Sequence, residues 1–193
     1  MARKKYDFRP DPTGLDWVSK LLPTKKQRSD LLKWLLYSLV CVMGLVFQDS
    51  MLARLRLFGG SFDLAPALIV LICVMEGCEN GSVFALAASL VYAFSGSAQD
   101  RYCIVLLTAA AVLAAAFRQS YLRRSAGSSL ICTGVAMLAY ELCILGAGVF
   151  LELTYPGRWP VFVMTALVST LAAGVLYRPL QAIGTIGGTV WKE

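Results

Sequence analysis

The chain has 193 residues, of which 58% are hydrophobic, and it carries a formal net charge of +6 without any histidine. This apolar fraction exceeds the roughly 45–50% of soluble domains and is concentrated in long blocks, which excludes an ordinary soluble core. The cations gather in the N-terminal tail and in one short loop, a distribution that favours segments facing an anionic membrane surface over nucleic-acid binding.

The first thirty residues form a basic tail. They hold eight of the eighteen Lys and Arg residues, together with prolines at positions 10, 12 and 23. No short hydrophobic region with a small-residue cleavage site precedes the first apolar run, so a cleavable signal peptide is not predicted. We expect residues 1–30 to be a cytoplasmic tail and the first apolar helix to remain as a membrane anchor.

Six apolar blocks follow, and each predicts a membrane-spanning helix. They lie at about 31–49, 63–77, 80–96, 102–118, 128–152 and 159–177. The predicted fold class is therefore an all-α polytopic membrane protein, with a six-helix transmembrane bundle over residues 31–178. Residues 179–193 are rich in glycine, and we expect them to form a short cytoplasmic tail without a confident helix.

The polar stretch MEGCENGS at residues 75–82 decides the number of spans. A single broken helix over residues 63–96 would give five spans, but its 34 residues would be about 51 Å long, against about 30 Å of hydrocarbon. With a hairpin there, the chain has six spans, and fourteen Lys and Arg residues lie on the cytoplasmic side of the membrane against four on the outer side. With five spans, five of those fourteen cations would lie on the outer side instead. The positive-inside rule therefore predicts six spans with both termini in the cytoplasm.

The predicted hairpin contains two carboxylates, Glu76 and Glu79, and no cation. Gly77 and Gly81 allow the chain to reverse within a few residues. One interpretation is a tight, solvated hairpin tip. The other is a small acidic surface offered to a basic cytoplasmic partner.

Glu141 lies in the middle of the fifth predicted span. An ionisable group at that depth costs about 2.5–3.5 kcal/mol on insertion scales unless it is paired, protonated or hydrated. Gly134 and Gly148 stand one heptad before and after it, on the same helix face. We expect Glu141 to face another helix, either as a protonated, hydrogen-bonded carboxyl or as a contact to a membrane partner or a lined cavity. No intramembrane Lys or Arg is predicted to pair with it.

The third predicted span carries a small residue at every fourth position: Gly81, Ala85, Ser89 and Ala93. Such a ridge lets helix backbones approach closely and gain packing that lipid does not supply. Packing inside the chain is one interpretation, with the alanine-rich fourth span as partner. Docking of another membrane protein is the alternative.

Catalytic and metal-binding patterns are absent from the sequence. There is no histidine, no HExxH and no phosphate-binding GxxxxGK loop, so neither an enzyme nor a cofactor is predicted. The six cysteines contain no CxxC pair and lie mostly within apolar runs, which favours buried thiols over a zinc site or a disulfide framework.

Residues 45–100 resemble the bacterial rod-shape-determining protein family MreD. The segment LFGGSFDLAPALIVLICVMEGCENGSVFALAASLVYAF is similar to the family's acidic start of span two, its hairpin and its glycine-bearing span three. Asp63 matches the acidic residue that commonly follows a proline, and Phe62 replaces that proline here. Gly81 matches the glycine that opens span three. Ala85 and Ser89 stand where glycines are usual, and Ala93 where an aspartate often ends that helix.

The resemblance implies a non-catalytic subunit of the cell-elongation machinery in the bacterial inner membrane. Such a subunit pairs with the bitopic protein MreC and links cytoplasmic MreB filaments to peptidoglycan synthases. The family's fold is also similar to the substrate-binding components of energy-coupling-factor vitamin transporters, which supplies the alternative function. That alternative needs an outward-opening pocket lined by polar and aromatic side chains, to which Arg54, Arg56, Asp63 and Glu152 could contribute.

Overall fold

The computed structural model describes residues 25–52, 60–98, 102–122 and 125–186. These residues form helices α2 (Lys25–Ser50), α3 (Leu64–Glu76), α4 (Cys78–Phe94), α5 (Cys103–Tyr121), α6 (Ala126–Phe150), η2 (Pro156–Arg158), α7 (Trp159–Val175) and α8 (Tyr177–Thr185). Most of the predicted basic tail, Arg54 and Arg56, and the end of the predicted C-terminal tail lie outside the described residues.

Four of these helices are long and apolar enough to cross a membrane. They run from Gln27 to Ser50, Cys103 to Tyr121, Ala126 to Phe150 and Pro156 to Val175. Helices α3 and α4 are apolar but shorter, with 13 and 17 residues. At 1.5 Å per residue α3 is about 20 Å long, less than the thickness of a hydrocarbon core. The described residues contain helices and no strand, and four of the helices are membrane-like, which confirms the predicted all-α class.

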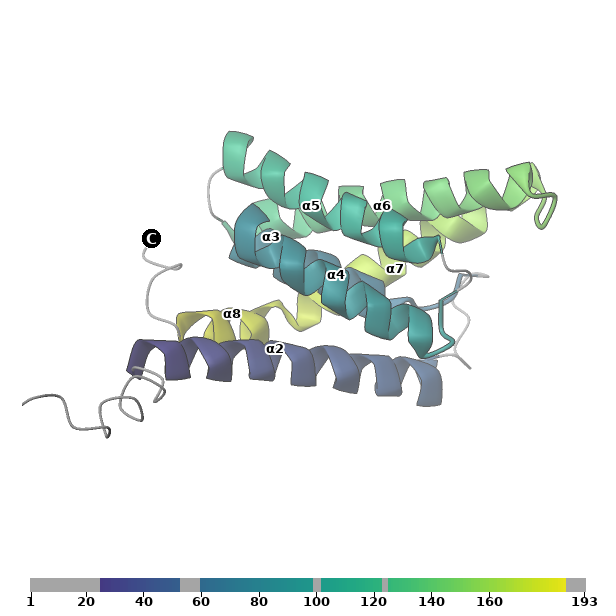
Figure 1. Cartoon of the computed structure of the whole chain (residues 1–193). Coiled ribbons are helices and arrows are strands. Elements are labelled where there is room, and N and C mark those ends of the chain that lie inside the picture. The colour runs from purple at the N-terminus through teal and green to yellow at the C-terminus, as the bar shows by residue number, and fades with distance from the viewer. Residues whose placement is uncertain (1–24, 53–59, 99–101, 123–124, 187–193) are drawn as a thin grey trace, which may run out of the picture.

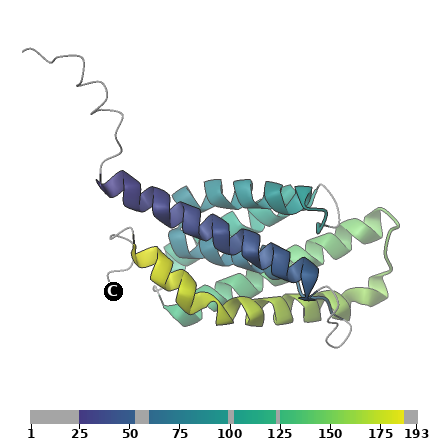
Figure 2. The same cartoon turned by 90° about the horizontal axis from the view of Figure 1, so that it is seen from below.

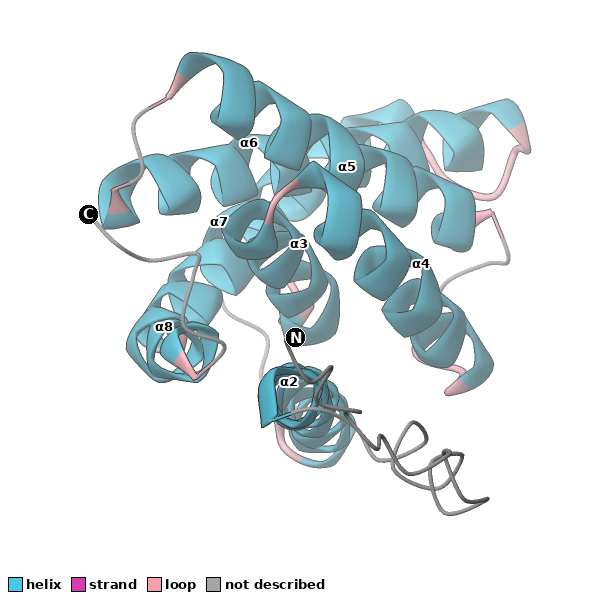
Figure 3. Cartoon of the chain, turned by 60° about the vertical axis from the view of Figure 1, so that its left-hand side comes forward, coloured by secondary structure: helices cyan, strands magenta, loops and turns pink. Residues whose placement is uncertain are grey.

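Helix α3 lies at the centre of the molecule, and the other helices surround it (Figure 3). Every one of its residues is buried. Helices α2, α4, α5, α6, α7 and α8 all pack against it. The reason is in its sequence, since LAPALIVLICVM offers no polar face, and a helix that is apolar all round belongs in an interior. The second predicted span is therefore a core helix rather than a lipid-facing one.

Helix α2 stands at the edge of the bundle, as Figures 1 and 2 show. It packs against α3 and α8 with one side, and its other side exposes a row of large apolar residues. Among them are Leu35, Leu39, Val42, Met43 and Val46. Apolar side chains on an outer helix face are expected where the solvent is lipid.

The stretch MEGCENGS forms a hairpin between two separate helices. Gly77 takes φ 92°, a left-handed conformation that other residues rarely adopt, and it ends α3 while α4 starts at the next residue. The two helices then run back alongside each other so closely that a Cβ on Gly81 would lie 2.7 Å from the carbonyl oxygen of Cys73. The prediction of two helices and a turn, rather than one broken helix, is confirmed.

The chain ends differently from the prediction. Residues 179–185, expected to begin a tail without a confident helix, belong to α8 (Tyr177–Thr185), which packs against α2 and α3. Tyr177, Leu180 and Gly184 are buried on one face, while Arg178 is exposed. Buried contacts along this apolar face outweigh the helix-weakening effect of glycine, which propensity alone could not show.

Candidate functional site

Glu76 is buried at the end of α3, which contradicts its prediction as part of a solvated or partner-facing turn. Its carboxylate forms a salt bridge with Lys33 of α2, and both side chains are buried. The hydroxyl of Tyr37 donates a second hydrogen bond to Glu76 Oε1 at 2.8 Å and lies 3.5 Å from the carbonyl oxygen of Leu180. One polar cluster therefore joins α2, α3 and α8.

Aromatic rings cover this ion pair. The ring centroids of Trp34 and Phe84 are 5.7 Å apart, and those of Trp34 and Tyr37 are 5.9 Å apart. The ammonium group of Lys33 also lies 5.7 Å from the Trp34 ring. By excluding water, these rings place the pair in a medium of low dielectric constant, where breaking it is costly.

A second cation reaches the same end of α3. Arg118 of α5 is buried, and its Nη1 donates a hydrogen bond of 2.5 Å to the carbonyl oxygen of Val74. Carbonyls in the last turn of a helix have no partner within the helix, and a cation there complements the helix dipole. Two of the cations counted as cytoplasmic are therefore structural, because they hold the end of the central helix. Glu79, in contrast, is exposed.

The sequence also contains a signal for this polar cluster. Lys33 and Tyr37 are one helical turn apart in the first span, so both lie on the same face of α2. A cation and a hydroxyl on one face of an apolar helix predict a polar partner on another helix, because lipid offers none.

The opposite end of α3 is held by side chains from α2 and α7. The backbone amide of Asp63 donates to Ser169 Oγ at 2.8 Å, and that of Ala65 donates to Gln48 Oε1 at 2.8 Å. Gln48 Nε2 in turn donates to the Asp63 carboxylate at 3.4 Å. Asp63, the residue matched to the family's acidic position, therefore lies where α2, α3 and α7 meet.

Glu141 is buried within α6, with 2% of its surface exposed. Its Oε1 has no hydrogen-bond partner among the described residues. Its carboxyl group interacts electrostatically with that of Asp63. The expectation that Glu141 faces another helix rather than lipid agrees with this burial, and the acidic group that interacts with it comes from the start of α3.

The two glycines placed on the same helix face as Glu141 have different neighbours. A Cβ on Gly134 would lie 3.4 Å from Thr170 Cγ2 of α7, so this glycine faces the α6–α7 contact. A Cβ on Gly148 would lie 2.9 Å from Thr154 Cγ2, in the turn that follows α6. Gly134 therefore lies at the α6–α7 interface, whereas the absence of a side chain at Gly148 leaves space for the turn that follows α6.

The ridge of small residues on α4 packs inside the chain. Gly81 meets the backbone of Cys73 in α3, and Ala85 is fully buried. Ser89 is also fully buried, and its hydroxyl lies 2.9 Å from that of Thr108 in α5. These residues hold α4 against its neighbours in this chain and do not offer a surface to another protein.

Two apolar grooves lie on the outside of the helices instead. One, of about 510 Å³, runs between α5 and α6 and is hereafter the α5–α6 groove. It is lined mainly by small or apolar residues, among them Ala110, Leu113, Ala114, Phe117, Ile131, Val135, Ala136 and Ala139. The other, of about 550 Å³, lies between α2 and α7 and is lined by larger side chains such as Leu39, Met43 and Phe47.

No protein-family model, curated protein or solved structure matches this chain. The resemblance of residues 45–100 to the MreD family therefore stays a prediction.

Proposed function

We propose that this chain is a non-catalytic integral membrane scaffold of the bacterial cell-elongation complex, located in the inner membrane. The observation that carries the proposal is the α5–α6 groove, an open apolar surface lined by several alanines. Small residues let a second helix approach closely, and close packing is what drives helix association in lipid. The small-residue ridge of α4 does not serve this purpose, because it is already used within the chain.

The occupant we propose for the α5–α6 groove is the single membrane-spanning helix of an MreC-type partner. On α5 the groove is lined at positions 110, 113, 114, 116, 117, 120 and 121, which lie along one side of the helix. These positions cover about three helical turns, a length that suits one helix lying along the groove between α5 and α6. MreB filaments and wall synthases complete the proposed set of partners, together with membrane lipids.

The alternative is a substrate-binding component of a vitamin transporter. In its favour, Asp63, Gln48 and Glu141 place polar groups in the interior close to the end of α2. Against it, the two grooves described above are lined almost wholly by apolar side chains, and specific capture of a polar vitamin needs several placed polar groups. The scaffold is therefore the better-supported function.

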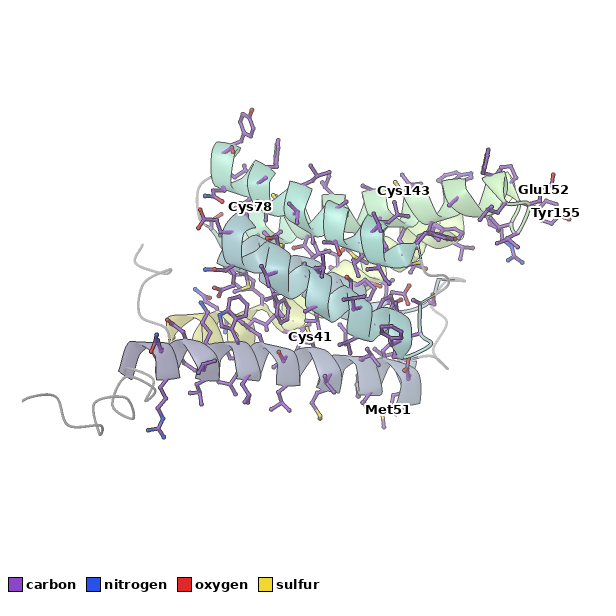
Figure 4. All side chains as sticks on the ribbon, in the orientation of Figure 1. Cys41, Met51, Cys78, Cys143, Glu152 and Tyr155 are labelled. Carbon is purple, nitrogen blue, oxygen red and sulfur yellow. The ribbon has the colours of Figure 1, made fainter. Side chains whose placement is uncertain are left out.

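We propose six spans with both termini in the cytoplasm. Figure 4 supports this arrangement, because Cys78 in the hairpin lies at one end of the molecule, whereas Met51, Glu152 and Tyr155 lie at the other. The hairpin end also holds Lys33 and Arg118, in keeping with the positive-inside rule.

Thiol labelling tests this topology. Cys78 is partly exposed, and we expect a membrane-impermeant maleimide to label it in inside-out vesicles but not in right-side-out vesicles, with the labelled peptide identified by mass spectrometry. Glu152 is exposed at the opposite end, so a Glu152→Cys variant is the matched control and should show the reverse pattern. Labelling of Cys78 from the outside would refute the six-span arrangement.

A pull-down from native membranes tests the scaffold. A tagged chain in mild detergent is expected to recover MreC-like and wall-synthase proteins, identified by mass spectrometry. Ala139→Trp fills the α5–α6 groove and should lower recovery of the MreC-like protein by about tenfold or more, equivalent to about 1.4 kcal/mol. Ala109→Trp is the control, since Ala109 is exposed on α5 but outside the groove. Recovery of a transporter ATPase module with a bound vitamin would overturn the proposal.

A further inference from the structure

Among the residues that the structure describes, no Lys or Arg forms an ion pair with the buried carboxyl of Glu141. Its Oε1 has no hydrogen-bond partner among the described residues, and the described group that interacts with it most strongly is another carboxyl, that of Asp63. The two buried cations among the described residues, Lys33 and Arg118, are bound at the opposite end of α3, to Glu76 and to the carbonyl of Val74. A buried charge without a partner is too costly to persist, so the acid must be neutralised in some other way.

The groups around Glu141 do not supply a positive charge. On α6 itself its neighbour is Tyr140, and Tyr92 of α4 also interacts with it electrostatically. Cys103 of α5 interacts with both tyrosines. Helix α7 contributes no ionisable residue to its packing against α6, since WPVFVMTALVSTLAAGV contains none. From α2, Asp49 interacts electrostatically with Asp63 and with Tyr92. The cluster is therefore acidic or neutral on every side that the structure describes.

We propose that Glu141 and Asp63 form a proton-binding site, in which Glu141 carries the proton and Asp63 remains ionised. The hydrogen bonds assign the two roles. Asp63 accepts a hydrogen bond from Gln48 Nε2, which favours its charged form, whereas Glu141 is almost fully buried with an oxygen that receives none. Two carboxylates that interact in a medium of low dielectric constant do not both ionise, so the charge on Asp63 keeps the proton on Glu141.

A proton suits the site better than a metal ion. Among the described residues, no group of three or more His, Cys, Asp or Glu side chains is arranged to hold a metal. Calcium or magnesium would require six or more oxygen ligands, or a shell of retained waters, in an interior packed with apolar side chains. The inference goes beyond the scaffold function and does not depend on it.

Infrared spectroscopy of the reconstituted full chain tests the site directly. A protonated carboxylic acid absorbs separately from a carboxylate, and we expect such a band at pH 7 in the wild type. The band should be lost in Glu141→Gln, an isosteric change, and kept in Glu79→Gln, which removes an exposed carboxylate. Raising the pH should abolish the band in the wild type. Absence of any band that depends on Glu141 would overturn the proposal.

A second variant tests the role of Asp63 and guards against misfolding of Glu141→Gln. Asp63→Asn removes the neighbouring charge, so the wild-type band should disappear at a pH lower by about one unit or more. An unchanged midpoint would show that Asp63 does not hold the proton in place. Exchange of potassium for sodium at constant pH and ionic strength should leave the band unchanged. Its loss on addition of sodium would show a sodium site and refute the proton site.

Discussion

Replacing Lys33 by methionine is expected to lower the free energy of unfolding of the bundle by about 3–5 kcal/mol, the usual cost of leaving one member of a buried ion pair behind. Methionine keeps the length and apolar stem of lysine, so the effect comes from leaving the Glu76 carboxylate without its cation. Unfolding of the detergent-solubilised protein by a denaturing detergent, followed by tryptophan fluorescence, measures it. The nearby Trp34 ring lies within the affected cluster.

A double-mutant cycle separates the ion pair from the packing around it. Glu76→Leu should destabilise the bundle, and the Lys33→Met/Glu76→Leu double variant should be more stable than the sum of the two single changes predicts. Glu79→Gln, an exposed carboxylate in the same turn, is the control and should change the stability by less than about 0.5 kcal/mol. Strict additivity of the two single changes would show that Lys33 and Glu76 do not stabilise each other.

Gly81→Ala is expected to destabilise the bundle by about 1–3 kcal/mol through overpacking at the α3–α4 contact. The added Cβ would lie 2.7 Å from the carbonyl oxygen and 2.9 Å from the Cα of Cys73. Both are backbone atoms, so no side-chain rotation relieves the clash, and the two helices must move apart. The same unfolding measurement reports the loss.

Gly146→Ala provides the matched control for this substitution. Gly146 is also helical, but nothing lies within 4 Å of the position that its Cβ would occupy. The change there should be neutral or should stabilise the protein by up to about 1 kcal/mol, because alanine loses less backbone entropy than glycine on helix formation. Equal destabilisation by the two alanines would mean that the close approach of α3 and α4 does not constrain position 81.

The turn at residues 75–82 shows which structural features can be predicted from the sequence and which cannot. Its glycines and the charge distribution predict a hairpin, and the structure has one. The same reasoning placed Glu76 in solvent, because a carboxylate beside two glycines is usually exposed. Its actual partner, Lys33, is 43 residues away in the sequence, on the opposite side of the first outer loop. A pairing at that separation follows only from how α2 and α3 pack.

The sequence by itself determined the all-helical class and the approximate limits of the six apolar helices. The physical reason is that every backbone polar group within hydrocarbon must be bonded internally, so apolar blocks of sufficient length become helices whatever their neighbours are. Only the tertiary structure decided that α3 is the central helix, that α8 closes against α2, and that Lys33, Arg118 and Asp63 hold the ends of α3. These features cannot be predicted from hydropathy, because it does not distinguish an apolar side chain that faces lipid from one that faces another helix.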